Sequence, residues 1–192
     1  MKSRDYISLG IYTALFFVVI MLVVFITSMS IVAYAFGITI AAIPAAIIYI
    51  LMRLKVKKKG SVLLSGLVIA ALEFLIGAGW PIALAMAIGS LIAELITQRG
   101  QYEKFWPISI GYSIFMTCTA LGTYGPIIFM KDYISKQSAS NKIDPNYMNA
   151  LLNFLQPKIL IIILISTFVS AILGCLISKR ILNKNFKKAG II

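Results

Sequence analysis

Two carboxylates, Glu73 and Glu94, lie inside long apolar stretches of the chain and are its clearest candidates for chemistry. If those stretches cross a membrane, a carboxylate near the bilayer centre costs roughly 2.5–3.5 kcal/mol, so it should face protein or water. Glu73 precedes Gly77 by one helical turn, which predicts either a ligand or ion contact or a structural hydrogen bond to a neighbouring Ser, Thr or Tyr. For Glu94 we predict a local charge pair with Arg99 or with a neighbouring basic loop.

The other reactive residue types argue against catalysis. The chain has no His, which removes Ser/His and Cys/His nucleophiles and imidazole metal sites. Cys118 and Cys175 lie in separate apolar stretches, where Cys commonly serves as a small hydrophobe. A membrane-embedded enzyme would need paired carboxylates, yet most of two predicted helices separate Glu73 from Glu94. We therefore expect no catalytic residue, no metal site, no cofactor in this chain and no enzymatic activity.

These residues are positioned by six apolar stretches, each about long enough to cross a bilayer. A helical span needs roughly 20 mostly apolar residues. Of the 192 residues, 60% are apolar and the mean hydropathy is +0.96, well above soluble domains. We predict a single all-α transmembrane domain over residues 1–192, a polytopic protein with six spans. Their predicted ranges are 7–28, 31–52, 61–78, 82–98, 106–129 and 158–178.

Lys and Arg fall mainly in alternate gaps between these spans. Fourteen of the eighteen lie in segments that share a side with the N-terminus, and the other four are Lys131, Lys136, Lys142 and Lys158. The positive-inside rule then places both termini in the cytoplasm, with the protein in the plasma membrane. The net charge of +12 is explained by insertion and anionic lipid, because the basic residues do not form a stripe with interleaved aromatics typical of nucleic-acid binding.

The longest connection is the predicted outer loop at 130–157, between the fifth and sixth spans. Asp144 is a good N-cap, Pro145 suits the first helical position, and apolar residues follow at helical spacing until Pro157. We predict a short amphipathic helix here. It is either an interfacial anchor or a lid over an outward-facing pocket.

Small residues at four-residue spacing recur in several spans, where they allow close packing of helices in lipid. Most such pairs predict internal packing. Gly10 and Ala14 differ because they lie near the cytoplasmic end of the first span, beside a basic N-terminus. We predict that a second membrane subunit docks there.

Several segments carry a resemblance to a known family: KSRDYISLGIYTALFF at the start, EFLIGAGWP at the third outer turn, IAELI in the fourth span and TYGPIIFMKDY leaving the fifth. With six helices in fewer than 200 residues, the chain resembles the substrate-binding S component of an energy-coupling factor (ECF) transporter. It is similar to the integral membrane family labelled Trep_Strep, or MptD-type. The resemblance covers essentially the whole chain.

The resemblance implies an importer subunit that captures a micronutrient at the outer face. It would work with a transmembrane T component and two ATP-binding cassette (ABC) ATPases, toppling in the membrane to deliver its substrate inward. The family's docking motif is an Ala-xxx-Ala pair on the first helix, where this chain has Gly10 and Ala14. The chain lacks a G-x-x-x-x-G-K-[ST] phosphate-binding motif, which suits a subunit whose partners use the ATP. The alternative is a gradient-driven small transporter or channel; a membrane-embedded enzyme is less favoured.

An outer pocket formed by the upper parts of these helices would have five candidate substrate contacts: Tyr34, Glu73, Trp80, Tyr124 and Tyr133. This set is aromatic, with one acid and little positive charge. It favours a planar, partly apolar compound such as a cationic or amphipathic vitamin, or a tetrapyrrole.

Overall fold

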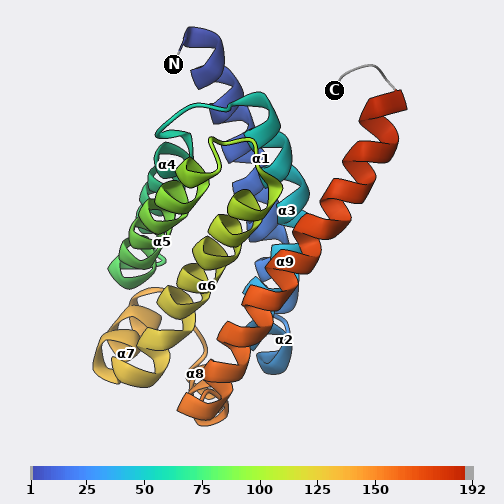
Figure 1. Ribbon diagram of the computed structural model, residues 1–192. Coiled ribbons are helices and arrows are strands. Elements are labelled where there is room, and N and C mark those ends of the chain that lie inside the picture. Colours follow the sequence, from blue (N-terminus) through green and yellow to red (C-terminus); the bar gives the residue numbers. More distant parts are fainter. Residues whose placement is uncertain (1, 189–192) are drawn as a thin grey trace.

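The computed structural model describes residues 2–188, and in this part of the chain all regular structure is helical. Nine helices are described, and the labels of Figure 1 are used from here on. In chain order they are α1 (Ser3–Thr27), α2 (Ile31–Ala35), α3 (Gly37–Lys55), α4 (Ser61–Leu75), α5 (Trp80–Arg99), α6 (Phe105–Phe129), α7 (Lys131–Ser140), α8 (Pro145–Phe154) and α9 (Pro157–Lys188).

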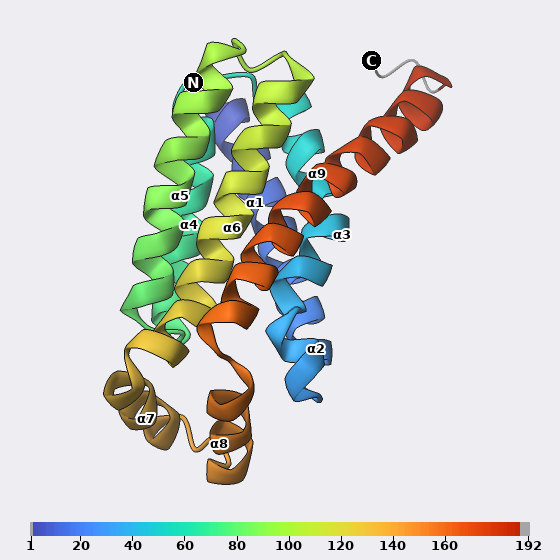
Figure 2. The same ribbon diagram turned by 60° about the horizontal axis from the view of Figure 1, so that its bottom comes forward.

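The six long helices α1, α3, α4, α5, α6 and α9 run side by side as a bundle (Figures 1 and 2). One end of the bundle, here called the terminal end, holds the start of α1, the connections at 56–60 and 100–104, and the last turns of α9. The opposite end, here called the loop end, holds the short helices α2, α7 and α8. The last turns of α9 project away from the other helices at the terminal end (Figure 2).

Length and apolar composition mark four helices as candidate membrane spans on their own: α1, α3, α5 and the first 26 residues of α9. Helices α6 and α7 pass the same test as a pair, bent by 103° at Met130. Helix α4 is apolar but has only 15 residues. Each predicted span contains one bundle helix, but only four of these helices, or five with the bent pair, qualify as spans in the described residues, because α4 is too short.

Two of the predicted span boundaries are wrong at the loop end. The predicted span at 31–52 is two helices, because Phe36 leaves helical geometry (φ −104°, ψ 10°) between α2 and α3. The predicted span at 61–78 ends at Leu75. Gly77 there has a left-handed backbone (φ +89°), its N–H donates to the Phe74 carbonyl, and the Ala78 N–H donates to the Glu73 carbonyl. This is a Schellman motif, which needs Gly at that position.

The connection at 130–157 contains one more helix than predicted. Helix α8 is confirmed, and the Asp144 Oδ1 accepts from the Asn146 N–H at 2.9 Å as its N-cap. Helix α7 was not predicted, because its sequence is polar overall. Its inward face is nevertheless helical in spacing, made of Tyr133, Ile134, Gln137 and Ser138. Beyond the sixth predicted span at 158–178, α9 continues helical to Lys188.

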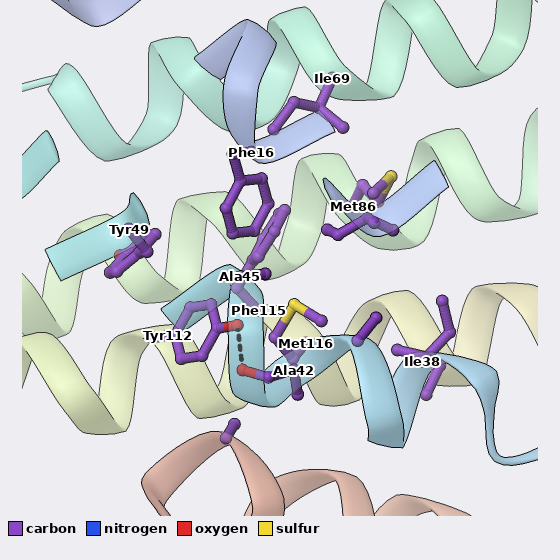
Figure 3. Packing of buried hydrophobic residues seen from close by; sticks show 14 of the residues in the cluster. Phe16, Ile38, Ala42, Ala45, Tyr49, Ile69, Met86, Tyr112, Phe115 and Met116 are labelled. Carbon is purple, nitrogen blue, oxygen red and sulfur yellow. Dashed lines mark hydrogen bonds between the residues drawn. The ribbon is translucent and has the colours of Figure 1, made fainter. Parts of the chain in front are cut away.

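The centre of the bundle is packed by aromatic and small residues (Figure 3). The Phe16 ring lies 6.2 Å from each of the Tyr49, Tyr112 and Phe115 rings, measured between centroids. The Tyr112 hydroxyl donates to the Ala42 carbonyl at 2.7 Å, which ties α6 to α3. Such a bond satisfies a polar group where no water is available.

Small residues let α3 and α9 approach closely, as predicted for internal packing. A Cβ atom added at Gly174 of α9 would lie 2.9 Å from the Ala42 carbonyl oxygen and 2.9 Å from the Ile43 Cα. Both pairs of alanines in α3, Ala41 with Ala45 and Ala42 with Ala46, are completely buried. Close contact between backbones replaces the hydrophobic driving force that is missing in lipid.

Candidate functional site

A cavity of about 220 Å³ lies at the loop end, beside the last turn of α4. Its walls come from α1 through α6, and its cover comes from α7, α8 and the segment between them. Apolar side chains such as Ile20, Val24, Ile38 and Ile82 make up much of the wall. The polar side chains that line it are Tyr34, Glu73, Thr119, Thr123, Tyr133, Gln137, Ser138 and Asn141.

Glu73 is the one charged residue among the described lining residues. Its side chain is placed by the end of α4, because the Schellman motif at Gly77 begins at the Glu73 carbonyl and fixes this last turn. The residue is only 3% exposed. Among the side chains that the structure describes, those of residues 2–182, none forms a hydrogen bond or an ion pair with its carboxylate. It therefore presents an unpaired acid to the cavity.

Of the five predicted substrate contacts, Tyr34 and Tyr133 line the cavity together with Glu73. Tyr124 does not line it. Its hydroxyl donates to the Tyr34 carbonyl at 2.6 Å and accepts from the Ile38 N–H at 3.3 Å, so it supports the wall from behind. The two tyrosine rings meet edge to face, with centroids 5.8 Å apart.

Trp80 also lies outside the cavity wall. It is the first residue of α5, is 47% exposed, and packs edge to face on Tyr133 with ring centroids 6.0 Å apart. An indole at a helix end that is half-exposed is typical of an interfacial anchor. Its contact with the cavity is indirect, through Tyr133.

Five polar lining residues were not predicted: Thr119 and Thr123 on α6, and Gln137, Ser138 and Asn141 at α7. The two threonines are spaced by one helical turn in an apolar helix, a signal that the sequence carries. Gln137 carries no such signal, because α7 itself was not predicted. Its Nε2 donates to the Gly77 carbonyl at 2.9 Å, and the Asn141 Nδ2 donates to the same oxygen at 3.4 Å.

These hydrogen bonds fasten α7 to the connection between α4 and α5. Helix α8 is fastened in a similar way, since the Tyr147 hydroxyl donates to the Ser28 carbonyl at 3.1 Å. Met148 and Leu151 of α8 also line the cavity, and Leu151 is buried. Of the two predicted roles for the connection, this position above the cavity favours a cover over a simple anchor.

Glu94 lies at the other end of the molecule. Of its two predicted partners, Arg99 is wrong, while the neighbouring basic connection at 56–60 does contribute, through the Gly60 backbone N–H. Its Oε1 accepts from the Gly60 N–H at 2.6 Å, and its Oε2 accepts from the Val62 and Leu63 N–H groups at 2.9 and 3.2 Å. The Tyr102 hydroxyl donates to Oε1 as well. Glu94 thus caps the N-terminus of α4 from the neighbouring helix, where the helix dipole favours a negative charge.

Arg53 is the counterpart of Glu94 at the terminal end. Its position in the sequence suggested a loop charge, but the residue is fully buried. Its Nη1 donates to the Ser61 Oγ at 2.6 Å, and its guanidinium lies 5.3 Å from the centroid of the Tyr49 ring. Arg53 and Glu94 both hold the first turn of α4, so this cluster is structural.

Gly10 and Ala14 lie on an exposed face of α1. A Cβ added at Gly10 would meet no atom within 4 Å. Internal packing was the alternative to a docking role for this pair. The pair takes no part in packing the described bundle. No group of three or more His, Cys, Asp or Glu side chains in the described residues is placed to hold a metal ion.

Comparison with protein families identifies a match over nearly the whole chain. Residues 3–188 match a family model described as a hypothetical bacterial integral membrane protein, Trep_Strep. No curated protein and no solved structure matches the chain.

Proposed function

The chain belongs to the Trep_Strep family of hypothetical bacterial integral membrane proteins. We propose that it is the substrate-binding S component of an ECF-type ABC importer. It is a multi-pass membrane protein. The observation that carries the proposal is the covered cavity at the loop end, with Glu73 buried in its wall. A pocket of this kind, at one end of a helical bundle and lined by convergent polar groups, suits capture of a small molecule.

In the proposed cycle the loop end faces outward. The substrate enters the cavity beside Glu73, and α7 with α8 closes over it. A partner T component then packs on the α1 face that carries Gly10 and Ala14, which is exposed in this chain. Two partner ABC ATPases supply the energy, because the chain has no phosphate-binding motif of its own. The substrate is a vitamin-like micronutrient, and the protein acts in the plasma membrane.

The proposed orientation rests on charge. Lys57, Lys58 and Lys59 are exposed at the terminal end, beside the start of α1 and its Lys2 and Arg4. Basic residues in short connections near span ends favour the cytoplasmic side. Both termini are therefore proposed to be cytoplasmic.

A gradient-driven small transporter is the second candidate, and one observation favours it. Two helices are interrupted beside the cavity, at Phe36 between α2 and α3 and at Met130 between α6 and α7. Broken helices that surround a binding site are typical of secondary transporters. In the ECF cycle the same breaks serve the closing of the cover.

Uptake separates the two candidates. The compound to follow is the one identified by mass spectrometry of small molecules that remain bound through purification. In cells that carry the chain with a T component and ATPases, we expect inactivation of the ATPases to abolish uptake, while collapse of the proton and sodium gradients by ionophores leaves it nearly unchanged over short times. Uptake that persists without the ATPases and stops with the ionophores would replace the ECF assignment with the gradient-driven one.

A further inference from the structure

The Glu73 carboxylate lies in unfavourable surroundings for an anion. It is 3% exposed, and no donor from the described residues compensates its charge. It also belongs to the last turn of α4, where the helix dipole presents its negative end and disfavours a second negative charge. A buried unpaired ion costs several kcal/mol unless a partner reaches it. A ligand that is positive or donates hydrogen bonds would remove this cost.

The other polar groups in the cavity wall point to the same kind of partner. The Thr119 hydroxyl donates to the Phe115 carbonyl at 2.9 Å, and the Thr123 hydroxyl donates to the Thr119 carbonyl at 2.8 Å. The Ser138 hydroxyl likewise donates to the Ser135 carbonyl at 3.0 Å. A hydroxyl has a single hydrogen to donate, so these oxygens keep only lone pairs for a ligand.

The side-chain amides are partly committed. The Gln137 and Asn141 amide nitrogens each donate one N–H to the Gly77 carbonyl, which leaves a second N–H and the amide oxygen of each. No Lys or Arg is among the described lining residues. The wall thus offers one carboxylate and several neutral acceptors. Its remaining donors are neutral too, the Tyr34 and Tyr133 hydroxyls and one N–H of each amide, so no positive charge from the described residues faces Glu73.

We propose that the cavity binds a small organic monocation, a protonated amine on a compact apolar body, with Glu73 as its counter-ion. This inference rests on the proposed function and names the substrate class of the same site. The ammonium group supplies the N–H donors that Glu73 and its neighbouring acceptors lack. The Tyr34 and Tyr133 rings add aromatic faces that attract a cation.

Size restricts the ligand further. The cavity volume of about 220 Å³ lies below the roughly 300–1,000 Å³ of pockets that hold drug-sized molecules. A tetrapyrrole is too large for a cavity of this volume, so it is not the substrate we propose. Ile20, Val24, Ile38 and Ile82 line the apolar part of the wall and suit a short hydrocarbon or single-ring body.

Three probes of one size and shape test the charge preference: phenethylamine, 2-phenylethanol and phenylacetate, which are cationic, neutral and anionic at pH 7. Binding to the purified full chain in detergent is measured by titration calorimetry. We expect the ammonium to bind at least tenfold more tightly than the alcohol, about 1.4 kcal/mol, and phenylacetate to bind weakest. Preference for the alcohol or the anion would overturn the proposal, as would no binding of any probe up to roughly 10 mM.

Variants then assign the preference to one carboxylate. We expect Glu73→Gln to remove the tenfold preference for the ammonium while binding of the alcohol is retained, and Glu73→Asp to keep part of it. Glu103→Gln is the matched control, because Glu103 is an exposed carboxylate at the terminal end, paired with Lys57 at 3.3 Å. Unchanged ammonium affinity in a folded Glu73→Gln protein would contradict the proposal.

The two proposals fail in different ways. If the ammonium preference holds but uptake does not need the ATPases, the cation site belongs to another class of transporter. If uptake needs the ATPases but the preference is absent, only the substrate class is wrong.

Discussion

Two buried carboxylates of this protein lie at opposite ends of helix α4. Glu94 lies against the N-terminus of α4 and accepts three backbone N–H bonds from residues 60–63. Glu73 lies in the last turn of the same helix with no partner in the described chain. The N-terminus of a helix stabilises a negative charge and the C-terminus does not. The same residue type therefore serves structure at one end of α4 and is free for a ligand at the other.

Tyr102 completes the Glu94 cluster. Burial raises its pKa well above the usual range, and the hydrogen bond to the Glu94 carboxylate raises it further. The phenol therefore stays protonated and donates at neutral pH. Since the phenol lies in the 100–104 connection, the cluster also holds that connection against the start of α4.

Replacing Glu94 should destabilise the fold. We expect Glu94→Gln to lower the free energy of unfolding by about 2 kcal/mol or more, since hydrogen bonds to a buried charge contribute roughly 1.5–3 kcal/mol each. For a protein of this size that corresponds to a fall in Tm of about 4–8 °C. Thermal unfolding in detergent measures it. Glu103→Gln should change Tm little, because an exposed ion pair contributes about 0–1 kcal/mol. Equal Tm values for the two variants would mean that Glu94 does not cap α4.

Two glycines on different helices have different surroundings, one packed against a neighbouring helix and one exposed. Gly174 of α9 lies against the backbone of α3, with no room for a side chain. Gly10 of α1 has open space around it and is exposed. Both match the small-residue pattern of helix contacts in membranes. In the described chain Gly174 has an internal neighbour and Gly10 has none, so the α1 face around Gly10 is open to a partner.

A matched pair of substitutions tests this difference. We expect Gly174→Leu to destabilise the bundle by about 1–3 kcal/mol or more, because the added side chain must push the α3 and α9 backbones apart. Gly10→Leu should leave Tm and substrate binding unchanged but block uptake. Thermal unfolding, calorimetry and transport assays measure the three properties.

If Gly10→Leu lowers Tm as much as Gly174→Leu does, Gly10 packs within the protein and the α1 face is not a docking surface. If it leaves uptake intact, the T component packs elsewhere.

At the scale of the whole molecule, the two ends differ in charge and in architecture. The loop end has the cavity and its cover, and the terminal end has the exposed lysines at 57–59 and the Arg53–Glu94 cluster. The proposed import cycle, with substrate captured at the loop end and energy supplied at the terminal end, requires a defined orientation in the membrane. The charge distribution predicts it.

Labelling of single cysteines tests the orientation. Ser140 and Lys58 are both exposed and lie at opposite ends of the bundle. We expect Ser140→Cys to react with a membrane-impermeant maleimide in intact cells, and Lys58→Cys to react only after the membrane is permeabilised. The unsubstituted protein is the control for Cys118 and Cys175, of which Cys175 is buried. The reverse pattern would place the cavity on the cytoplasmic side.

Features that depend on local composition were predictable from the sequence. The six bundle helices follow from runs of apolar residues, because a helix is the structure that satisfies its own backbone in lipid. Helix α8 follows from Asp144 and Pro145, since capping involves residues only a few positions apart. The unusual position of Glu73 was also predictable, because a carboxylate in an apolar stretch is expensive wherever that stretch packs.

Features that depend on how the helices are rotated and which of them meet required the tertiary structure. Tyr124 and Trp80 were grouped with Tyr34 and Tyr133, but helix packing places one behind the cavity wall and the other at its edge. Gln137 joins the site only because α7 folds back onto the Gly77 carbonyl, 60 residues earlier in the chain. Glu94 binds the amides of α4 instead of nearby Arg99. Hydropathy and spacing report the environment of a residue along its own helix, whereas its partners are set by contacts between segments far apart in sequence.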